Sequence, residues 1–287
     1  MRITSWGHAV FAATVIALGL LGLIQGGFTP VFEPVPKGLP AHEAFAYLCA
    51  ILCLATGLGL LWQRSAVIGA QVLWIFFLFW TLLVKARFIV LAPLVEGSYQ
   101  SCGENAVVIA AAWVLYASFA TTPSGCGFAF AIGDRGVRNA RVLYALAMIA
   151  FGLSHFFYLD LTAPLVPAWL PAHVFWAYFT GVTYLLAGVA ILAGRLARQA
   201  TALSTLQMGL FTLLVWMPLM VAGPMNAEQW GELVVSWTLT ASAWVVADSY
   251  SVKSAFFLGK QGSENRGRSA LSGAESRERR RRPDNLL

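Results

Sequence analysis

Long apolar stretches recur along this chain of 287 residues, separated by short segments that contain Gly, Pro and charged residues. An α-helix rises 1.5 Å per residue, so about 20 residues cross the roughly 30 Å hydrocarbon layer of a bilayer, and the stretches are close to this length. The pattern predicts an all-α polytopic membrane protein with eight transmembrane helices. Their expected ranges are 8–25, 43–62, 68–92, 105–120, 141–158, 173–193, 203–222 and 232–251.

The overall composition agrees with this prediction. Hydrophobic residues make up 59% of the chain and charged residues 11%, and the mean hydropathy is +0.70. A soluble globular domain carries about 25% charged residues. A membrane β-barrel would instead show short segments of alternating hydrophobicity. The composition excludes a soluble globular domain, and the long continuous apolar stretches exclude a β-barrel, so membrane-spanning helices remain.

An internal repeat organises the helices. The sequences VPKGLPAH (35–42) and VPAWLPAH (166–173) are nearly the same, and placing Val35 on Val166 aligns 35–118 with 166–249 without a gap. Of these 84 positions, 24 are identical. The repeat predicts two four-helix units in tandem. Because four is even, both units enter the membrane from the same side, which predicts two parallel four-helix bundles. The repeat also indicates that the apolar stretch after Arg2 is the counterpart of an internal helix rather than a secretory signal.

The repeat divides the chain into four parts. We expect a first four-helix unit at 1–120, a cytoplasmic linker at 121–140 and a second four-helix unit at 141–252. Residues 253–287 lack apolar periodicity and are rich in arginine, so we expect a disordered basic cytoplasmic tail.

The positive charges predict the orientation. With the N-terminus in the cytoplasm, 16 of the 19 Lys and Arg residues lie on the cytoplasmic side, and the exceptions are Lys37, Lys85 and Arg87. Cytoplasmic loops are enriched in these residues. Both termini are therefore expected inside. The net charge of +6 reflects this topology and requires no nucleic-acid partner.

His155 is the first candidate ligand-binding residue. It lies near the outer end of the fifth expected helix, just before Asp160, and an alignment through Gly22 and Gly152 gives Gln25 as its counterpart. A polar side chain at this depth is favoured either by a hydrogen bond to a neighbouring helix or by contact with a ligand or proton.

Lys85 and Arg87 are the second candidates. They lie near the outer end of the third expected helix, and their counterparts are Trp216 and Pro218. Either they extend to the interface, or they face inward and pair with an acidic residue or bind an anionic or quinone-like head group. The acidic candidates are Glu96 and Glu104.

The sequence LPAH is first of all expected to begin a helix, because proline is tolerated where the backbone donor has no partner. A ligand role for His42 or His173 is the alternative. Cys49 and Cys53 lie one turn apart and are expected to pack as small apolar residues. No metal site is predicted.

Residues 141–250 resemble the DoxX family of bacterial four-helix membrane proteins. The resemblance rests on a histidine in the first helix of the unit, on the VPAWLP loop at 166–171 and on WAYFTG at 176–181. It implies a location in the bacterial inner membrane and, loosely, a redox-associated or quinone-adjacent role.

Three functions fit these observations. The first is binding of a quinone or another lipophilic molecule in an outer cavity, with His155, Lys85, Arg87, Gln25, Asp160, His173 and Glu104 as the candidate ligand-binding residues. The second is a carrier with a path between the repeats, which would use mildly polar residues such as Thr183, Ser204 and Gln207. The third is a subunit or assembly partner of a membrane complex. A catalytic residue is not evident.

Overall fold

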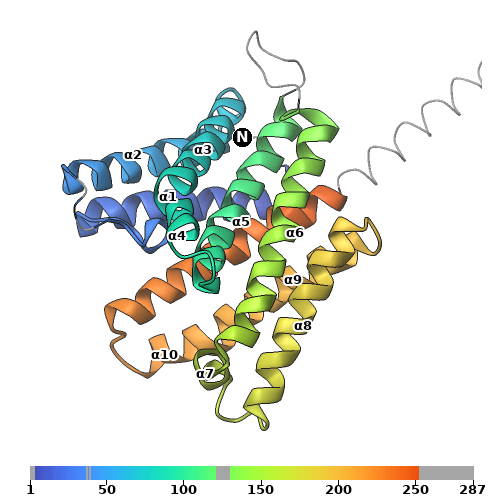
Figure 1. The fold of residues 1–287 in the computed structure, drawn as a ribbon. Helices are drawn as coiled ribbons and strands as arrows, with labels where there is room; N and C mark the ends of the chain where they lie inside the picture. The colour runs from blue at the N-terminus through green and yellow to red at the C-terminus, as the bar shows by residue number, and fades with distance from the viewer. Residues whose placement is uncertain (1–3, 37, 39, 121–129, 252–287) are drawn as a thin grey trace, which may run out of the picture. The chain divides into compact units, whose positions relative to one another are not determined.

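The computed structural model describes residues 4–36, 38, 40–120 and 130–251, and all regular secondary structure in these ranges is helical (Figure 1). The first part contains α1 (Trp6–Gln25), η1 (Pro30–Phe32), α2 (His42–Leu61), α3 (Ala66–Trp80), η2 (Thr81–Lys85), α4 (Ala86–Leu91) and α5 (Glu96–Phe119). The second contains α6 (Gly133–Phe157), α7 (Leu159–Thr162), η3 (Ala163–Leu165), α8 (His173–Leu192), α9 (Ala197–Phe211), η4 (Thr212–Trp216) and α10 (Met217–Ala222). Residues 227–251 form a further helix.

Seven helices in the described part of the chain are long and apolar enough to cross a bilayer. They are α1, α2, α3 to α4 taken as one (Ala66–Leu91), α5, α6, α8, and α9 to α10 taken as one (Ala197–Ala222). The prediction of an all-α polytopic membrane protein is confirmed. The helix at 227–251 is not one of these seven, so an eighth membrane crossing stays a prediction.

The helix ends differ most from the expected ones where a helix begins with polar residues. α5 begins at Glu96 rather than 105, and α6 begins at Gly133 rather than 141. Hydropathy alone does not register these turns, because their polar residues lower the mean hydropathy of the segment. The Asn139 amide donates to the Phe130 carbonyl, whereas the buried carboxylate oxygens of Glu96 have no hydrogen-bond partner among the described residues.

Positions that the repeat aligns share unusual local geometry. α2 and α8 each begin after an alanine with left-handed backbone, Ala41 at φ 52° and Ala172 at φ 58°. This region is uncommon for residues other than glycine. Both α3 and α9 continue into a π-helical turn of sequence TLLV followed by a buried side chain, Lys85 in one and Trp216 in the other.

The same hydrogen bond also occurs twice. The Asn105 amide donates to Thr81 Oγ1 over 3.1 Å, which ties η2 to α5. At the matching positions, Thr212 Oγ1 and Ser236 Oγ lie 2.6 Å apart and tie η4 to the helix at 227–251. Each π-helical turn is therefore joined by a buried polar contact to the next long helix of the chain, α5 in one case and the helix at 227–251 in the other.

Glycines permit the closest helix contacts. A Cβ added to Gly19 would lie 2.5 Å from the Leu54 nitrogen, and one added to Gly152 would lie 2.6 Å from Leu185 Cγ. The α1–α2 and α6–α8 crossings thus both require a glycine at their centre, since real Cβ atoms do not approach other atoms so closely. The repeat aligns Leu54 with Leu185.

Two further interfaces join the first and last parts of the chain. α5 packs along α6, and these two form the most extensive contact between labelled helices (Figure 1). The helix at 227–251 packs against α1: Asp248 accepts from the Gly7 N–H over 2.9 Å, and the Trp237 indole donates to Thr14 Oγ1 over 3.0 Å. Residues Met1–Asp248 accordingly form one compact unit.

Some predicted regions lie outside the described residues. These are the tail at 253–287, residues 121–129 of the expected linker, and Lys37. The described remainder of that linker, from 130 onward, contains the first two turns of α6.

Candidate functional site

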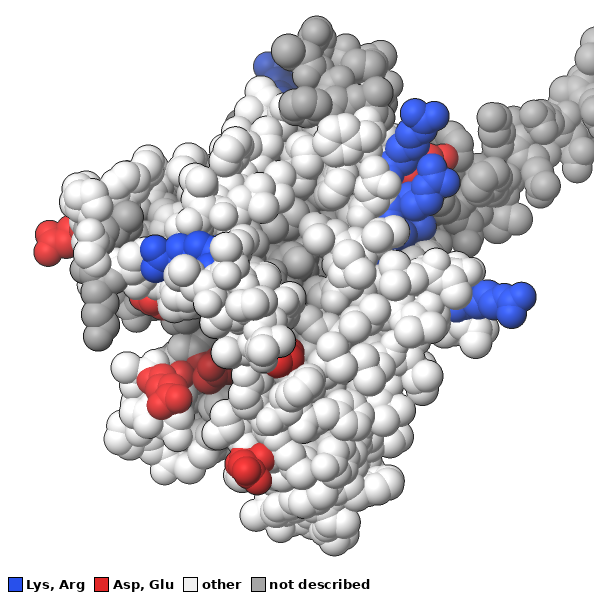
Figure 2. Space-filling view, viewed as in Figure 1, with Lys and Arg blue, Asp and Glu red and all other residues white. Residues whose placement is uncertain are grey.

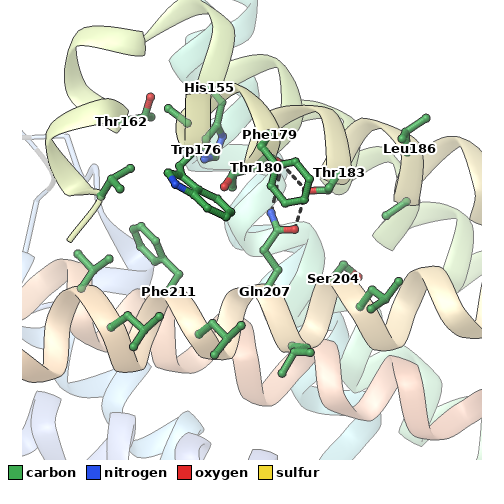
Figure 3. A pocket seen from close by; sticks show the side chains of 18 of the residues that line it. His155, Thr162, Trp176, Phe179, Thr180, Thr183, Leu186, Ser204, Gln207 and Phe211 are labelled. Carbon is green, nitrogen blue, oxygen red and sulfur yellow. Dashed lines mark hydrogen bonds between the residues drawn. The ribbon is translucent and has the colours of Figure 1, made fainter. Parts of the chain in front are cut away.

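A cavity of about 720 Å³ lies between α8 and α9, beside the loop at 166–170 (Figure 3). Ligand pockets commonly measure about 300–1,000 Å³. Most of its lining is apolar, including Trp169, Trp176, Phe179 and Phe211. Its volume and lining fit a drug-sized apolar ligand.

Three neutral polar residues form a cluster in the wall of this cavity. Thr183 Oγ1 donates to Gln207 Oε1 over 2.6 Å, and Gln207 Nε2 donates to the Thr180 carbonyl over 3.2 Å (Figure 3). Gln207 lies on α9 and the two threonines on α8. The cluster therefore both joins the two helices and presents amide and hydroxyl atoms to the cavity.

His155 extends from α6 into the same cavity (Figure 3). Its Nδ1 lies 2.8 Å from the Phe151 carbonyl oxygen, and its ring centroid lies 5.9 Å from that of Tyr184. Gly181 leaves room for the histidine, because a Cβ at 181 would lie 2.8 Å from His155 Cβ. The expected hydrogen bond from His155 to a neighbouring helix is not what the structure gives, since Phe151 lies on α6 itself; a ligand-binding role stays a prediction.

The outer rim of the cavity is apolar and exposed. Leu186 on α8 is 62% exposed, and Leu203 and Leu206 on α9 are 65% and 57% exposed. α8 carries no Asp, Glu, Lys or Arg, and the surface over it is almost entirely uncharged in Figure 2. In a membrane-spanning chain, such a surface faces lipid or a neighbouring apolar helix.

Lys85 lies elsewhere, in the first part of the chain, and it faces inward. It is 1% exposed, its Nζ lies 3.8 Å from Glu104 Oε2, and it donates to the Ser101 carbonyl over 3.3 Å. Of the two acidic partners expected for it, Glu104 forms the ion pair. The alternative, in which Lys85 extends to the interface, is wrong.

The α8–α9 cavity is not the expected cavity lined by His155, Lys85 and Arg87 together. His155 lines the α8–α9 cavity, whereas Lys85 and Arg87 do not. Arg87 is exposed, with its guanidinium 4.7 Å from the ring centroid of the neighbouring Phe88. Lys85 lies in η2 and Arg87 in α4, whereas His155 lies in α6. The sequence places all three near the same expected depth in the membrane, but depth does not tell which helices are neighbours.

The pairing of Gln25 with His155 is also wrong. Gly19 packs on Leu54 and Gly152 packs on Leu185, so Gly19 is the counterpart of Gly152 when α1 is aligned with α6. The contacts Gly57–Ile16 and Gly188–Ile149 give the same register. In this register Gly22, not Gln25, is the counterpart of His155. The gapless repeat does not include α1, so its register was set by the single pair Gly22 and Gly152. Glycine is frequent in this chain, and one pair of glycines does not fix a register.

The remaining candidates lie outside the cavity. Gln25 and Asp160 are exposed, and His173 is half-buried at the first position of α8. Cys49 and Cys53 are buried on α2 with free thiols. Among the described residues, no group of three or more His, Cys, Asp or Glu side chains is arranged to hold a metal ion.

The sequence did identify Thr183, Ser204 and Gln207 as mildly polar membrane residues, but as part of a carrier path rather than of a pocket. Thr180 was not singled out. Its role depends on its carbonyl oxygen, which accepts from Gln207, and a backbone atom leaves no signal in the residue type.

Together, the fold and the cavity define a polytopic helical membrane protein with an apolar pocket between two helices. Comparison of the chain with protein-family models, with curated proteins and with solved structures finds no match. The pocket itself is therefore the basis for any functional conclusion.

Proposed function

We propose that this chain is a DoxX-like protein of the bacterial inner membrane that binds an uncharged lipophilic molecule in the α8–α9 pocket. The carrying observation is the pocket of about 720 Å³, with an apolar exposed rim and a small neutral polar cluster in its wall. A redox-associated context with a quinone as the bound molecule is one form of this proposal.

We further propose that the chain is a tandem duplication of two parallel four-helix units, with the helix at 227–251 as the eighth membrane crossing. The matched alanines, π-helical turns and polar contacts support it. Eight crossings place both termini in the cytoplasm, in agreement with the positive charges. A reporter enzyme fused after Leu287 is expected to be active only when cytoplasmic activity is assayed, and periplasmic activity would contradict this topology.

The experiment that tests ligand binding is mass spectrometry of lipids retained by the purified protein. Gln207→Phe introduces phenylalanine, the residue at the aligned position 76. The ring fills part of the cavity, and the amide is removed. We expect the ratio of bound lipid to protein to fall about tenfold, as a loss of roughly 1.4 kcal/mol of binding free energy produces.

Gln71→Phe is the matched control, because Gln71 lies on α3 and does not line the pocket. It should retain lipid as the unchanged protein does. Equal lipid retention by Gln207→Phe and Gln71→Phe would contradict the proposed pocket.

A carrier function receives less support. Its mildly polar residues bond to one another between neighbouring helices, as Tyr144 does with Ser204 over 2.8 Å and Thr183 with Gln207. Thr183, Ser204 and Gln207 line the one pocket, but the threonines of the π-helical turns, Thr81 and Thr212, do not extend it toward the first part of the chain. A partner in a membrane complex would instead cover the exposed leucines, and the same mass spectrometry would detect it as a co-purified protein in place of lipid.

A further inference from the structure

The pocket wall specifies the charge of its ligand. None of its lining residues is Asp, Glu, Lys or Arg, and His155 is the one titratable side chain among them. A phosphate or carboxylate in such a site would lose its hydration without a cation to pair with, which costs several kcal/mol. An uncharged head group avoids this cost.

The hydrogen-bonding role of His155 follows from its contact with Phe151. A carbonyl oxygen only accepts, so the Nδ1 that lies 2.8 Å from it carries the proton. In the neutral ring, Nε2 is then unprotonated and accepts a hydrogen bond. No donor to Nε2 is present among the described residues, so this nitrogen is available to a ligand.

Gln207 is held within the wall of the pocket. Its Nε2 must face the Thr180 carbonyl, because the reverse orientation would place two oxygens against each other, and its Oε1 accepts from Thr183. An amide nitrogen carries two hydrogens. The contact with Thr180 uses one, and the side chain of Gln207 is also hydrogen-bonded to the Tyr184 hydroxyl. His155 Nε2 is therefore the polar atom that remains for a ligand.

His155 lines the pocket beside the neutral polar cluster. It packs against Gly181, the residue that follows Thr180. Figure 3 shows the side chains of His155 and Gln207 extending into the pocket. A hydroxyl group of a ligand can donate the hydrogen bond that His155 Nε2 accepts.

The first part of the chain lacks this arrangement. Gly22 takes the place of His155, and the repeat aligns Thr183 with Leu52 and Gln207 with Phe76. A histidine is therefore not needed to assemble helices with this geometry. Its presence beside α8 requires a separate explanation, and a bound hydrogen-bond donor provides one.

We infer that the pocket binds a lipid whose uncharged head group carries a free hydroxyl, which donates a hydrogen bond to His155 Nε2. The tail of this lipid follows the exposed leucines of α8 and α9 into the bilayer. This inference rests on the proposed function and adds the chemical class of the ligand to it.

The test compares two probes that differ in one donor hydrogen, 4-dodecylphenol and its methyl ether 4-dodecylanisole. Their affinities for the full-length protein in detergent micelles are measured by isothermal titration calorimetry. Differences in partitioning into micelles cancel when each probe is compared between the unchanged protein and a variant. His155→Phe should weaken binding of the phenol about tenfold and leave binding of the ether unchanged.

His42→Phe is the matched control, because His42 lies against Phe28 and outside the pocket. It should leave both affinities unchanged. Gln207→Leu is a second variant that leaves His155 Nε2 in place, so it should change the affinities of the two probes by the same factor.

The outcomes separate the two proposals. If both probes bind and His155→Phe weakens them equally or not at all, the hydroxyl inference is overturned while the lipophilic pocket stands. If neither probe binds and no lipid co-purifies with the unchanged protein, the proposed function itself is overturned, and the inference with it.

Discussion

The first and second parts of the chain share a helical framework and differ in the polar groups they bury. Residues 66–119 enclose the Lys85–Glu104 ion pair, whereas the matching positions, Trp216 and Val235, are apolar. Conversely, the neutral polar pocket at α8 and α9 corresponds to Leu52 and Phe76 in the first part. The shared elements are those that fix the backbone, and the differing ones are side chains that carry charge or hydrogen bonds.

Residues that determine the fold can thus be separated from residues that determine the chemistry. Glycines at helix crossings and the threonines of the π-helical turns occur in both parts, so they are requirements of the framework. The ion pair and the pocket each occur in one part only. A function that uses either group is therefore asymmetric, whatever the symmetry of the helices.

The shared glycines should give the strongest destabilisation when they are replaced. Gly19→Ala and Gly152→Ala each force a Cβ to within 2.6 Å of an atom of the neighbouring helix, and the contact at Gly19 is with backbone. We expect each to lower the free energy of unfolding by about 3 kcal/mol, because the helices must separate. Reversible unfolding by sodium dodecyl sulfate in mixed micelles measures this change.

Gly209→Ala is the control for these variants. It lies in the interior of α9, and its added Cβ would meet Thr240 Cγ2 at an ordinary 3.5 Å. Its stability should equal or exceed that of the unchanged protein, since alanine favours helix by about 1 kcal/mol over glycine. A strong effect at only one of Gly19 and Gly152 would show that the two crossings are not equivalent.

A somewhat smaller effect is expected at the ion pair that distinguishes the first part. Lys85→Met leaves Glu104 without its cation, and we expect a loss of about 2 kcal/mol in stability. The loss is smaller than for a fully enclosed pair, because the Glu104 side chain is 26% exposed. The same unfolding titration provides the measurement.

A second substitution separates charge from packing. Lys85→Met combined with Glu104→Gln removes both charges, so stability should recover by more than half. If the double variant is no more stable than Lys85→Met, the lysine stabilises the protein through its aliphatic chain rather than through the pair.

The register that relates α1 to α6 can be tested at Gly22. A Cβ on Gly22 would lie 2.8 Å from the Cβ of Ala50, as a Cβ on Gly181 would from His155 Cβ. Gly22→Ala should therefore cost about 1 kcal/mol, and Ala50→Gly in the same chain should reverse that loss by removing the clashing atom. Failure of this rescue would mean that another contact restricts Gly22.

The sequence predicted the helices well because hydrophobic length is a property of each segment alone. α2 begins at His42 and α8 at His173, beside or at their expected starts. The beginnings of α5 and α6 were missed, since their polar first turns lower the hydropathy on which the prediction depends. The burial of Lys85 against Glu104 was one of two alternatives left open by the sequence. Its absence from the cavity that His155 lines was not predicted, because that depends on which helices are neighbours.

The weakest effect is expected at Gln25, the residue that sequence alignment placed opposite His155. Gln25 is exposed at the last position of α1, and its side chain makes no hydrogen bond that the structure describes. Gln25→Ala should change stability by less than about 0.5 kcal/mol and leave phenol binding unaltered, whereas His155→Phe weakens it. Measured together in the calorimetric assay, these two variants decide the register from function. A loss of binding in Gln25→Ala would restore the original alignment and place part of the site on α1.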